Sequence, residues 1–299
     1  MQSLVVNLSK REHFFSPKSG SWYGASWGSI HTWIVGIARR LYSFGVSADS
    51  IVGLCVNSQV EGLWIEQAVW HLGGAVIWFD DALPEDVLLD EILRSEITLL
   101  VLENTSLYVQ FEDALDELES LMMVFSLSPA QELVPLTPAA PDWTWFAQLQ
   151  PEAASEAPVL YFYDGPECRL LRQSSSAALL AQWRSTYVYR KRILVTGRLS
   201  SMTVRLALVS SISSGSAVYW SCAEPPLHLL QMARPQRWFV SHPDTVESLV
   251  SGWKPRVFPK LAVQRCGNRL SELICLQHPC SKVSHQVLSR AGVSIREAK

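Results

Sequence analysis

The sequence of 299 residues predicts an α/β fold of two subdomains, each built on a mainly parallel sheet that helices cover. Three observations carry this prediction. Short apolar runs of strand length alternate with amphipathic helical patterns along most of the chain. Residues 128–158 contain six prolines and interrupt this alternation. The charge also changes sign there, because residues 1–157 carry a net charge of −15 and residues 158–299 one of +12.

Predicted strands and helices alternate through the acidic first subdomain, which we place at residues 1–127. After a lead-in at 1–25, a helix is predicted from Ser26 to just before Gly45, because Ile30, Ile34, Ile37 and Leu41 share one face and Gly45 follows the end. Further helices are predicted near 57–72, 84–93 and 112–119. Strands are predicted at 51–56, 75–79, 97–102 and 121–127.

Residues 128–158 are predicted to be a linker or a surface crossover, and residues 159–299 a basic second subdomain. In this second subdomain, strands are predicted at 193–196, 217–222, 238–240 and 293–295. Helices are predicted at 177–183, 202–212, 227–232, 245–250 and 283–290. The opposite charges of the two subdomains indicate either that they dock on each other or that the basic half meets an anionic partner.

Residues 159–171 have the pattern of a strand, a tight loop and a following helix. An apolar run ends at Asp164, Gly165 and Pro166, and a helical pattern begins near Ser175. Loop amides and a helix N-terminus in this arrangement favour an anion such as phosphate. However, the loop has one glycine and contains no Ser, Thr or Lys between Gly165 and Leu171. The scaffold of a nucleotide loop is therefore predicted without the side chains that usually serve it.

Other chemistry finds little support in the sequence. The cysteines and histidines between Cys266 and His285 contain no C-x-x-C pair, so we expect no metal. The basic run Arg190 to Arg192 lies in no nucleic-acid motif, and there is no G-x-S-x-G elbow, so we expect neither a nucleic-acid partner nor a nucleophilic catalytic residue. No stretch has the length and composition of a signal peptide or a membrane span, and we expect a cytoplasmic protein with reduced thiols.

Several segments, in order, resemble motifs of the acyl-adenylate-forming enzymes, a family that includes acyl-CoA synthetases, adenylation domains and luciferases. Residues 51–58, Ile-Val-Gly-Leu-Cys-Val-Asn-Ser, resemble "D-x-V-A-I-x-x-x-N-S". Residues 71–80, followed by 83–85, resemble "L-x-x-G-A-V-x-x-P-L-x-x-x-x-P-x-x". Residues 159–171 stand where the family has its phosphate loop, "Y-T-S-G-T-T-G-x-P-K-G", and residues 266–271 resemble "S-G-G-A-P-L-S". The resemblance covers nearly the whole chain and implies the family's large N-terminal domain.

The departures from the family pattern concentrate in the phosphate loop. Pro166 lacks an amide donor and Glu167 adds a negative charge where the family has hydroxyl residues. The chain ends at Lys299, about where the family's adenine and magnesium motif begins, so we expect the C-terminal lid domain to be absent. The degenerate loop positions are Tyr163, Asp164, Gly165, Pro166, Glu167, Cys168 and Arg169.

The resemblance therefore implies a pseudoenzyme without catalytic residues or cofactors. We expect it to act as a binding or assembly partner of an active synthetase, an acyl carrier protein or a synthase. The alternative is a component that still binds an acyl group or carboxylate and that another chain completes. For that alternative, the resemblance places a candidate acyl pocket at Gly267.

Overall fold

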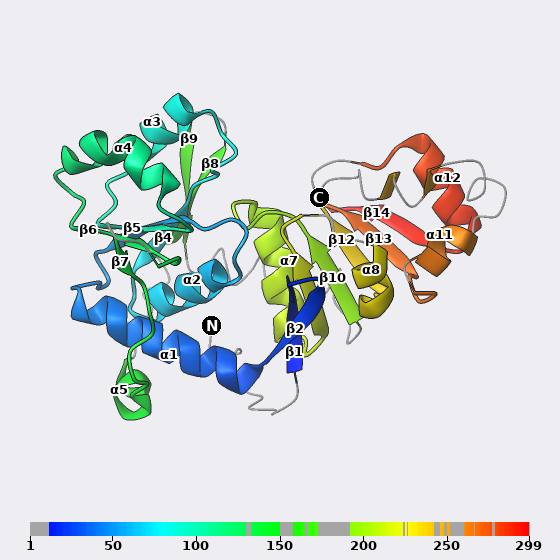
Figure 1. Ribbon diagram of the computed structural model, residues 1–299, viewed down its shortest axis with the longest axis horizontal. Coiled ribbons are helices and arrows are strands. Elements are labelled where there is room, and N and C mark those ends of the chain that lie inside the picture. Colours follow the sequence, from blue (N-terminus) through cyan, green and yellow to red (C-terminus); the bar gives the residue numbers. More distant parts are fainter. Residues whose placement is uncertain are drawn as a thin grey trace. The chain divides into compact units, whose positions relative to one another are not determined.

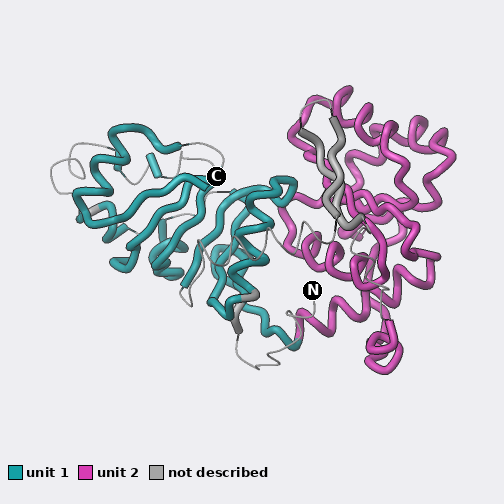
Figure 2. The backbone as a smooth tube through the Cα atoms, turned by 180° about the vertical axis from the view of Figure 1, so that it is seen from behind, with its two compact units in different colours: residues 1–28, 180–299 teal, residues 29–179 magenta. Residues whose placement is uncertain are grey.

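The computed structural model describes residues 12–129, 133–149, 158–164, 167–172 and 192–298, with gaps at 224, 226, 242–245, 248–249, 252–259, 266 and 277–278. The chain forms two compact units, which Figure 2 distinguishes by colour. Unit 1 contains residues 1–28 and 180–299, and unit 2 contains residues 29–179. Each unit has a seven-stranded, mainly parallel sheet, which confirms the predicted α/β class (Figure 1).

Unit 2 is built on the sheet β7-β6-β5-β3-β4-β8-β9. Its parallel strands are β3 (Ile51–Cys55), β4 (Ala75–Trp78), β5 (Leu99–Leu102), β6 (Met123–Ser126) and β7 (Val134–Pro135), and the hairpin β8 (Pro158–Asp164) and β9 (Glu167–Arg172) completes it. The helices are α1 (Trp27–Ser43), α2 (Glu61–His71), α3 (Glu85–Arg94), α4 (Ser106–Asp116) and α5 (Trp143–Gln148). Every residue of β4 and β5 is buried, which explains their continuous apolar sequences.

Unit 1 is built on the sheet β14-β13-β12-β10-β11-β1-β2. Its strands are β10 (Arg192–Thr196), β11 (Ala217–Ser221), β12 (Arg237–Val240), β13 (Glu272–Cys275) and β14 (Ser294–Glu297), with the hairpin β1 (Glu12–Lys18) and β2 (Ser21–Ser26) at one edge. Its helices include α7 (Met202–Ser213), α8 (Leu227–Ala233), α11 (Lys260–Arg265) and α12 (Lys282–Arg290).

The two sheets have the same strand order. In each, five parallel strands follow the order 5-4-3-1-2, and a hairpin lies beyond the second strand. The first hairpin strand is parallel to its neighbour in both cases, β1 to β11 and β8 to β4. The sequence analysis did not predict this structural repeat.

The hairpins also explain how the chain divides. The predicted boundaries at residues 127 and 158 both fall inside unit 2. The hairpin β1–β2 pairs with β11, about 200 residues later, while β8–β9 pairs with β4. Both pairings are long-range, so composition and charge along the chain carry little information about them.

Aromatic packing attaches β1–β2 to unit 1. The Phe15 ring stacks on Tyr219 at 4.5 Å between centroids, and the Trp22 ring meets Tyr219 edge-on at 5.1 Å. Trp22 Nε1 donates a hydrogen bond of 2.8 Å to the Leu229 carbonyl of α8. Burial raises the pKa of Tyr219, whose hydroxyl accepts a hydrogen bond from Arg192. The hairpin is therefore part of the unit 1 core.

The predicted linker packs against α1 within unit 2. The Ala139 amide donates to the Gly36 carbonyl at 3.1 Å, and a Cβ on Gly36 would lie 2.6 Å from the Ala139 carbonyl oxygen. Arg39 reaches the Ala140 carbonyl at 3.2 Å, and the Tyr42 ring lies 5.3 Å from that of Trp145. Glycine at position 36 is what permits this close approach of two backbones.

Several segments differ from the sequence prediction, including α4, which begins at Ser106 where the helix was expected over 112–119. Residues 167–172, expected as loop, form the strand β9, and the helix expected near 177–183 lies outside the described residues. The fully buried strand β13 was not predicted. It begins with Glu272, and a charged first residue in a strand of only four hides its apolar character.

A buried ion pair explains why β13 can begin with a charge. Arg237 and Glu272 are register partners at the start of β12 and β13, and their side chains are 3% and 8% exposed. Arg237 donates from Nε to Glu272 Oε2 at 2.7 Å, and its NH2 bonds the same oxygen. Arg296 Nε lies 3.3 Å from Glu272 Oε1. Each buried charge is thus compensated across three neighbouring strands.

We expect Glu272→Gln to lower the free energy of unfolding by about 3–5 kcal/mol, because it leaves the buried Arg237 guanidinium without its counter-charge. The double variant Arg237→Met with Glu272→Leu should cost less than this single change. Chemical denaturation measures both. Arg94→Gln, which breaks the exposed Asp90–Arg94 pair, is the control and should cost less than about 1 kcal/mol. Equal costs for Glu272→Gln and Arg94→Gln would contradict the assignment.

Two half-buried histidines hold α5. The Phe146 ring of α5 lies 5.7 Å from the His31 ring and 4.7 Å from the His71 ring. Burial lowers the pKa of His31, and His71 lowers it further by repulsion. Burial also lowers the pKa of His71, although its Nδ1 bonds the Gln67 carbonyl at 2.7 Å. The folded state therefore favours neutral imidazoles.

Because the pKa of each histidine is lower in the folded than in the unfolded chain, we expect stability to fall as pH drops below about 6.5. The double variant His31→Gln with His71→Gln should show a shallower decline between about pH 7.5 and 5.5. Urea unfolding followed by tryptophan fluorescence tests this, with exposed His285→Gln of α12 as control. Identical pH profiles for the double variant and the unaltered protein would refute it.

Candidate functional site

The carboxyl edge of the unit 2 sheet is the candidate ligand site. In open α/β sheets, ligands bind beyond the carboxyl ends of the strands, where connections leave in opposite directions. Here β4 lies on one side of β3 and β5 lies on the other, so this point falls between β3 and β5. The loops that follow these two strands contain Ser58 and Glu103.

The chain's own carboxylate occupies the donors at this point. The Ser58 amide donates to Glu103 Oε2 at 2.8 Å, and the Ser58 hydroxyl bonds Glu103 Oε1. The Ser128 hydroxyl donates to the Glu103 carbonyl at 3.0 Å, which fixes the loop from its other side. Sequence reasoning missed Glu103, and its only signal was a polar residue directly after a buried strand.

Two further acids lie at the same edge, after β4. The buried Asn57 amide donates from Nδ2 to the Phe79 carbonyl and to Asp81 Oδ1, both at 2.9 Å. Asp80 Oδ1 accepts the Ala82 amide at 3.0 Å. Asn57 thus connects the β3 and β4 loops and holds Asp81 in place.

The hairpin β8–β9, which carries the positions expected for a phosphate loop, reaches this edge. Because β8 is parallel to β4, its end at Asp164 lies at the carboxyl edge. The hairpin register pairs Asp164 with Glu167, Tyr163 with Cys168 and Phe162 with Arg169. Gly165 and Pro166 lie outside the described residues, as do the side chains of this hairpin. The register nevertheless places two acidic positions opposite each other beside the turn.

Unit 1 repeats the arrangement at α12. Glu247 accepts hydrogen bonds from the Ser281 amide and hydroxyl, both at 2.9 Å, and from the Ser284 hydroxyl at 2.6 Å. Partial burial would raise the pKa of Glu247, but the hydrogen bonds from Ser284 and Ser281 lower it overall. A carboxylate of the chain therefore accepts the donors at this helix N-terminus, a position that favours anions.

Gly267 lies at the opposite edge of the unit 1 sheet. It follows α11 and precedes β13, with φ of +77°, and its amide donates to the Gln264 carbonyl at 3.0 Å. A Cβ there would lie 2.7 Å from Arg234 Cγ. A left-handed helix end packed against α8 accounts for glycine at this position. Its position gives no support to an acyl pocket.

The described residues contain no group of three or more His, Cys, Asp or Glu that could hold a metal ion. Cys266 and His278 fall outside them. Cys275 and Cys280 contact each other beside α12, and the hydrogen bond from the Cys280 thiol lowers the pKa of Cys275 to about 7. This pair is therefore a local thiol contact at the end of β13.

Comparison with known proteins places the fold. No protein-family model matches the sequence, and no curated protein is similar to it. Among solved structures, a luciferase-like enzyme from Zophobas morio has a TM-score of 0.77 at 14% identity. The match covers 93% of this chain and 66% of the chain of that enzyme. The carboxylate reductase adenylation domain from Mycobacterium chelonae has a TM-score of 0.78 at 14% identity. This match covers 99% of this chain and 56% of the chain of that structure.

Acetoacetyl-CoA synthetase from Streptomyces lividans has a TM-score of 0.74 at 12% identity, covering 96% of this chain and 48% of its own. The chain thus spans about half to two thirds of the length of these enzymes. Likeness at such low identity establishes architecture. The chain has the fold of the N-terminal domain of the adenylate-forming enzymes.

Proposed function

We propose that the protein is a catalytically degenerate relative of the adenylate-forming enzymes and that it acts as a binding or assembly partner in an acyl-activation or biosynthetic pathway. The observation that carries the proposal is the accumulation of carboxylates at the carboxyl edge of the unit 2 sheet. Asp80, Asp81 and Glu103 lie there, and Asp164 and Glu167 flank the hairpin turn.

This edge is poorly suited to a nucleotide. A triphosphate would meet like charges, and the Ser58 amide and hydroxyl are already bonded to Glu103. At Pro166 there is no amide to donate. Each hydrogen bond to a charged oxygen contributes roughly 1.5–3 kcal/mol, so the loss of several moves a micromolar affinity beyond the millimolar range.

We therefore expect calorimetry to detect no ATP or AMP binding at micromolar concentrations, and carboxylate-dependent pyrophosphate exchange to stay at background. The triple variant Glu103→Gln, Pro166→Thr and Glu167→Thr should bind ATP measurably better, because it removes two charges and restores donors. Glu85→Gln, an exposed acid on α3, is the control. A micromolar dissociation constant for the unaltered protein would overturn the proposal.

The alternative is an acyl- or carboxylate-binding component that another chain completes. The observation in its favour is that the matches to a luciferase-like enzyme and to a carboxylate reductase adenylation domain cover 93% and 99% of this chain. Adenylation of a carboxylate panel, measured alone and with co-purified proteins, separates the two. Activity that appears only with a second chain, and disappears with ATP omitted, favours the alternative.

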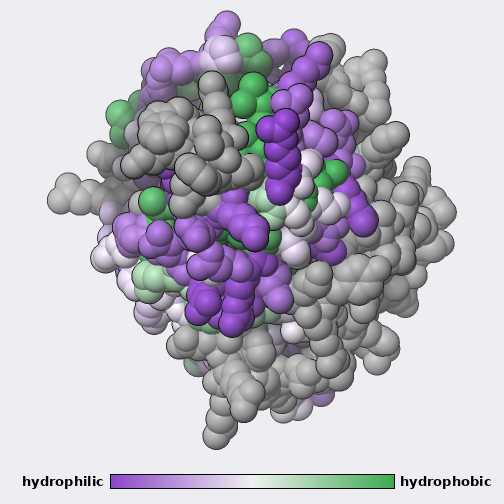
Figure 3. All heavy atoms as spheres, turned by 90° about the vertical axis from the view of Figure 1, so that its right-hand side faces the viewer, coloured by the Kyte–Doolittle hydropathy of each residue, from purple (hydrophilic) through white to green (hydrophobic). Residues whose placement is uncertain are grey.

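For a partner, the basic residues 158–299 favour an acidic protein such as an acyl carrier protein. In Figure 3, the described surface of one face of the molecule is mainly hydrophilic with small apolar areas, as in a transient polar contact. The described residues contain no helix long and apolar enough to cross a membrane. We propose that the protein acts in the cytoplasm, beside an active synthetase or synthase.

We expect such a partner to associate more slowly as salt rises from 0.1 to 1 M, because the Debye length falls from about 10 Å to about 3 Å. Pull-down with mass spectrometry identifies the partner, and stopped-flow mixing measures the rate. Small-angle scattering of the protein alone at both salt concentrations is the control for docking between its own halves. A salt-independent rate with salt-dependent scattering would favour internal docking instead.

A further inference from the structure

Two cysteines of unit 1 meet between the end of β13 and the start of α12. Cys275 is the last residue of β13 and is 3% exposed. The partly exposed Cys280 packs against the core cluster that contains Cys275, and both are free thiols. The Cys280 thiol and amide donate hydrogen bonds to the Cys275 sulfur. The two sulfur atoms are therefore in contact without a covalent bond between them.

These hydrogen bonds prepare one of the two sulfurs for oxidation. The bond from the Cys280 thiol is the main reason why the pKa of Cys275 falls to about 7, although burial and Glu297 of β14 raise it. The pKa of Cys280 is raised by its bond to Cys275, by burial, and by the charges of Cys275 and Glu247. Cys275 thus carries the thiolate, which is the form that attacks an oxidant, and Cys280 keeps a proton beside it.

The backbone holds the two cysteines differently. Cys275 pairs with Val240 of β12 on one side and with Glu297 of β14 on the other, so the sheet fixes it. Cys280 lies in the connection before α12, and four residues separate it from Cys275 in the sequence. Two sulfurs must approach to about 2.05 Å to form a disulfide. We therefore expect Cys280 to make most of that movement.

A movement of Cys280 reaches α12 through the next residue. Ser281 caps the helix, because its hydroxyl accepts the Ser284 amide at 3.2 Å. The Ser281 amide and hydroxyl in turn donate to Glu247, both at 2.9 Å. Displacing Cys280 towards β13 displaces the Ser281 amide with it. Bond formation between the sulfurs is therefore coupled to the Glu247 contact.

Another partly exposed cysteine lies at the same edge of the sheet. Cys222 directly follows β11, which is three strands from β13 in the order β13-β12-β10-β11. Adjacent strands lie about 4.8 Å apart, so Cys222 is roughly 14 Å from Cys275. A disulfide joins Cα atoms that are less than about 7 Å apart. Cys222 is therefore a matched thiol outside the reach of Cys275.

The burial of Cys275 favours a small oxidant. Susceptibility to peroxide depends on the thiolate character and the accessibility of a sulfur. Cys275 has the thiolate character, and its neighbour Cys280 is partly exposed, so solvent lies about one side chain away. Hydrogen peroxide is small enough to cover this distance, whereas a bulky disulfide has to align directly with the attacking sulfur.

We propose that Cys275 and Cys280 form a reversible disulfide in response to hydrogen peroxide, and that its formation changes the contacts of Ser281 at the start of α12. The Cys275 thiolate attacks one peroxide oxygen, the O–O bond breaks, and the leaving hydroxide takes up the proton that Cys275 had released. The Cys280 thiol then attacks the sulfur of the resulting sulfenic acid. The S–O bond breaks, and the hydroxyl group leaves with the Cys280 proton as a second water. A dithiol reductant restores both thiols.

The test treats the whole protein, reduced and freed of reductant, with hydrogen peroxide near pH 7. Trypsin then releases residues 270–282 as one peptide that contains both cysteines. We expect this peptide to lose the mass of two hydrogen atoms, to resist alkylation, and to recover both thiols with dithiothreitol. The disulfide should form at least about tenfold faster than Cys222 is oxidised, and at least about tenfold faster than in a synthetic peptide 270–282.

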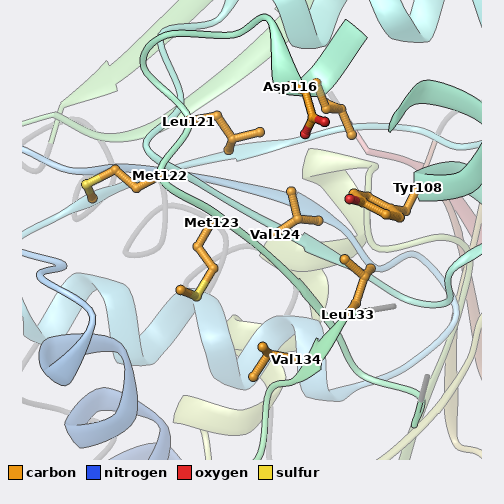
Figure 4. Close-up of a pocket in the computed structure, with 9 residues that line it drawn as sticks. Tyr108, Asp116, Leu121, Met122, Met123, Val124, Leu133 and Val134 are labelled. Carbon is orange, nitrogen blue, oxygen red and sulfur yellow. The ribbon is translucent and has the colours of Figure 1, made fainter. Parts of the chain in front are cut away.

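Met122 reports unselective oxidation in the same digest. It lies with Met123 at a hollow of about 280 Å³ on unit 2, which Figure 4 shows, and it is 60% exposed. A methionine gains one oxygen atom when peroxide converts it to the sulfoxide. The disulfide should be complete at peroxide concentrations that leave Met122 unmodified.

Two variants separate the roles of the thiols. Cys280→Ser should leave Cys275 as a sulfenic acid that dimedone traps, because the second thiol is missing. Cys222→Ser is the control and should form the disulfide at the rate of the unaltered protein. Thermal unfolding shows whether each variant folds, and the measurements on the unaltered protein do not depend on either. In the oxidised protein, the amide signal of Ser281 should move and that of Ser58 in unit 2 should not.

Several results would overturn the proposal. Peptide 270–282 could gain oxygen instead of losing hydrogen, or react no faster than Cys222 or than the synthetic peptide. The last of these would mean that closeness in the sequence, and not the fold, brings the sulfurs together. A disulfide that forms only after Met122 is oxidised, or that dithiothreitol does not reverse, also overturns it. An unmoved Ser281 amide in the fully oxidised protein overturns the coupling to α12.

Discussion

The pairing of a distant hairpin with the second strand of each parallel sheet is the constraint on which the architecture depends. Both sheets have the same five-strand order, and in both the second strand, β11 or β4, would be an open edge without the hairpin. Pairs such as Phe14 with Val218 and Val76 with Leu160 close these edges. The chain therefore cannot be divided into two consecutive domains, whatever its composition indicates.

At the ligand edges of both units, a carboxylate of the chain itself accepts the hydrogen bonds that the loops can donate. Ser58 in unit 2 and Ser281 in unit 1 each offer an amide and a hydroxyl at a loop or helix start. Glu103 and Glu247 accept both of these donors in their own unit. Two unrelated pairs of loops thus have the same local arrangement, in which a glutamate of the chain lies at a position that favours an anion. At the unit 2 edge, this contact adds to the carboxylates on which the proposed binding role rests.

Prediction from sequence succeeded where the signal was local. Strands β3 to β5 are continuous apolar runs, and α1 carries a regular apolar face, so their periodicity indicates their structure directly. It failed where a partner far along the chain decides the outcome. Glu272 starts a buried strand only because Arg237 neutralises it, and Glu103 is informative only through Ser58, 45 residues earlier. The departures at Pro166 and Glu167 were readable because a resemblance supplied the expected residues.

Unit 1 is formed by two separate stretches of the chain, and this has a consequence for synthesis. The hairpin β1–β2 leaves the ribosome before its partner strand β11, which follows about 200 residues later. Unit 2, whose residues are contiguous, can fold in that interval, because synthesis takes on the order of seconds for every few tens of residues. Until β11 emerges, the hairpin presents Phe15 and Trp22 without the Tyr219 ring that covers them. The interval before β11 is synthesised is therefore the stage at which these two aromatic side chains are uncovered and the protein is most prone to aggregate.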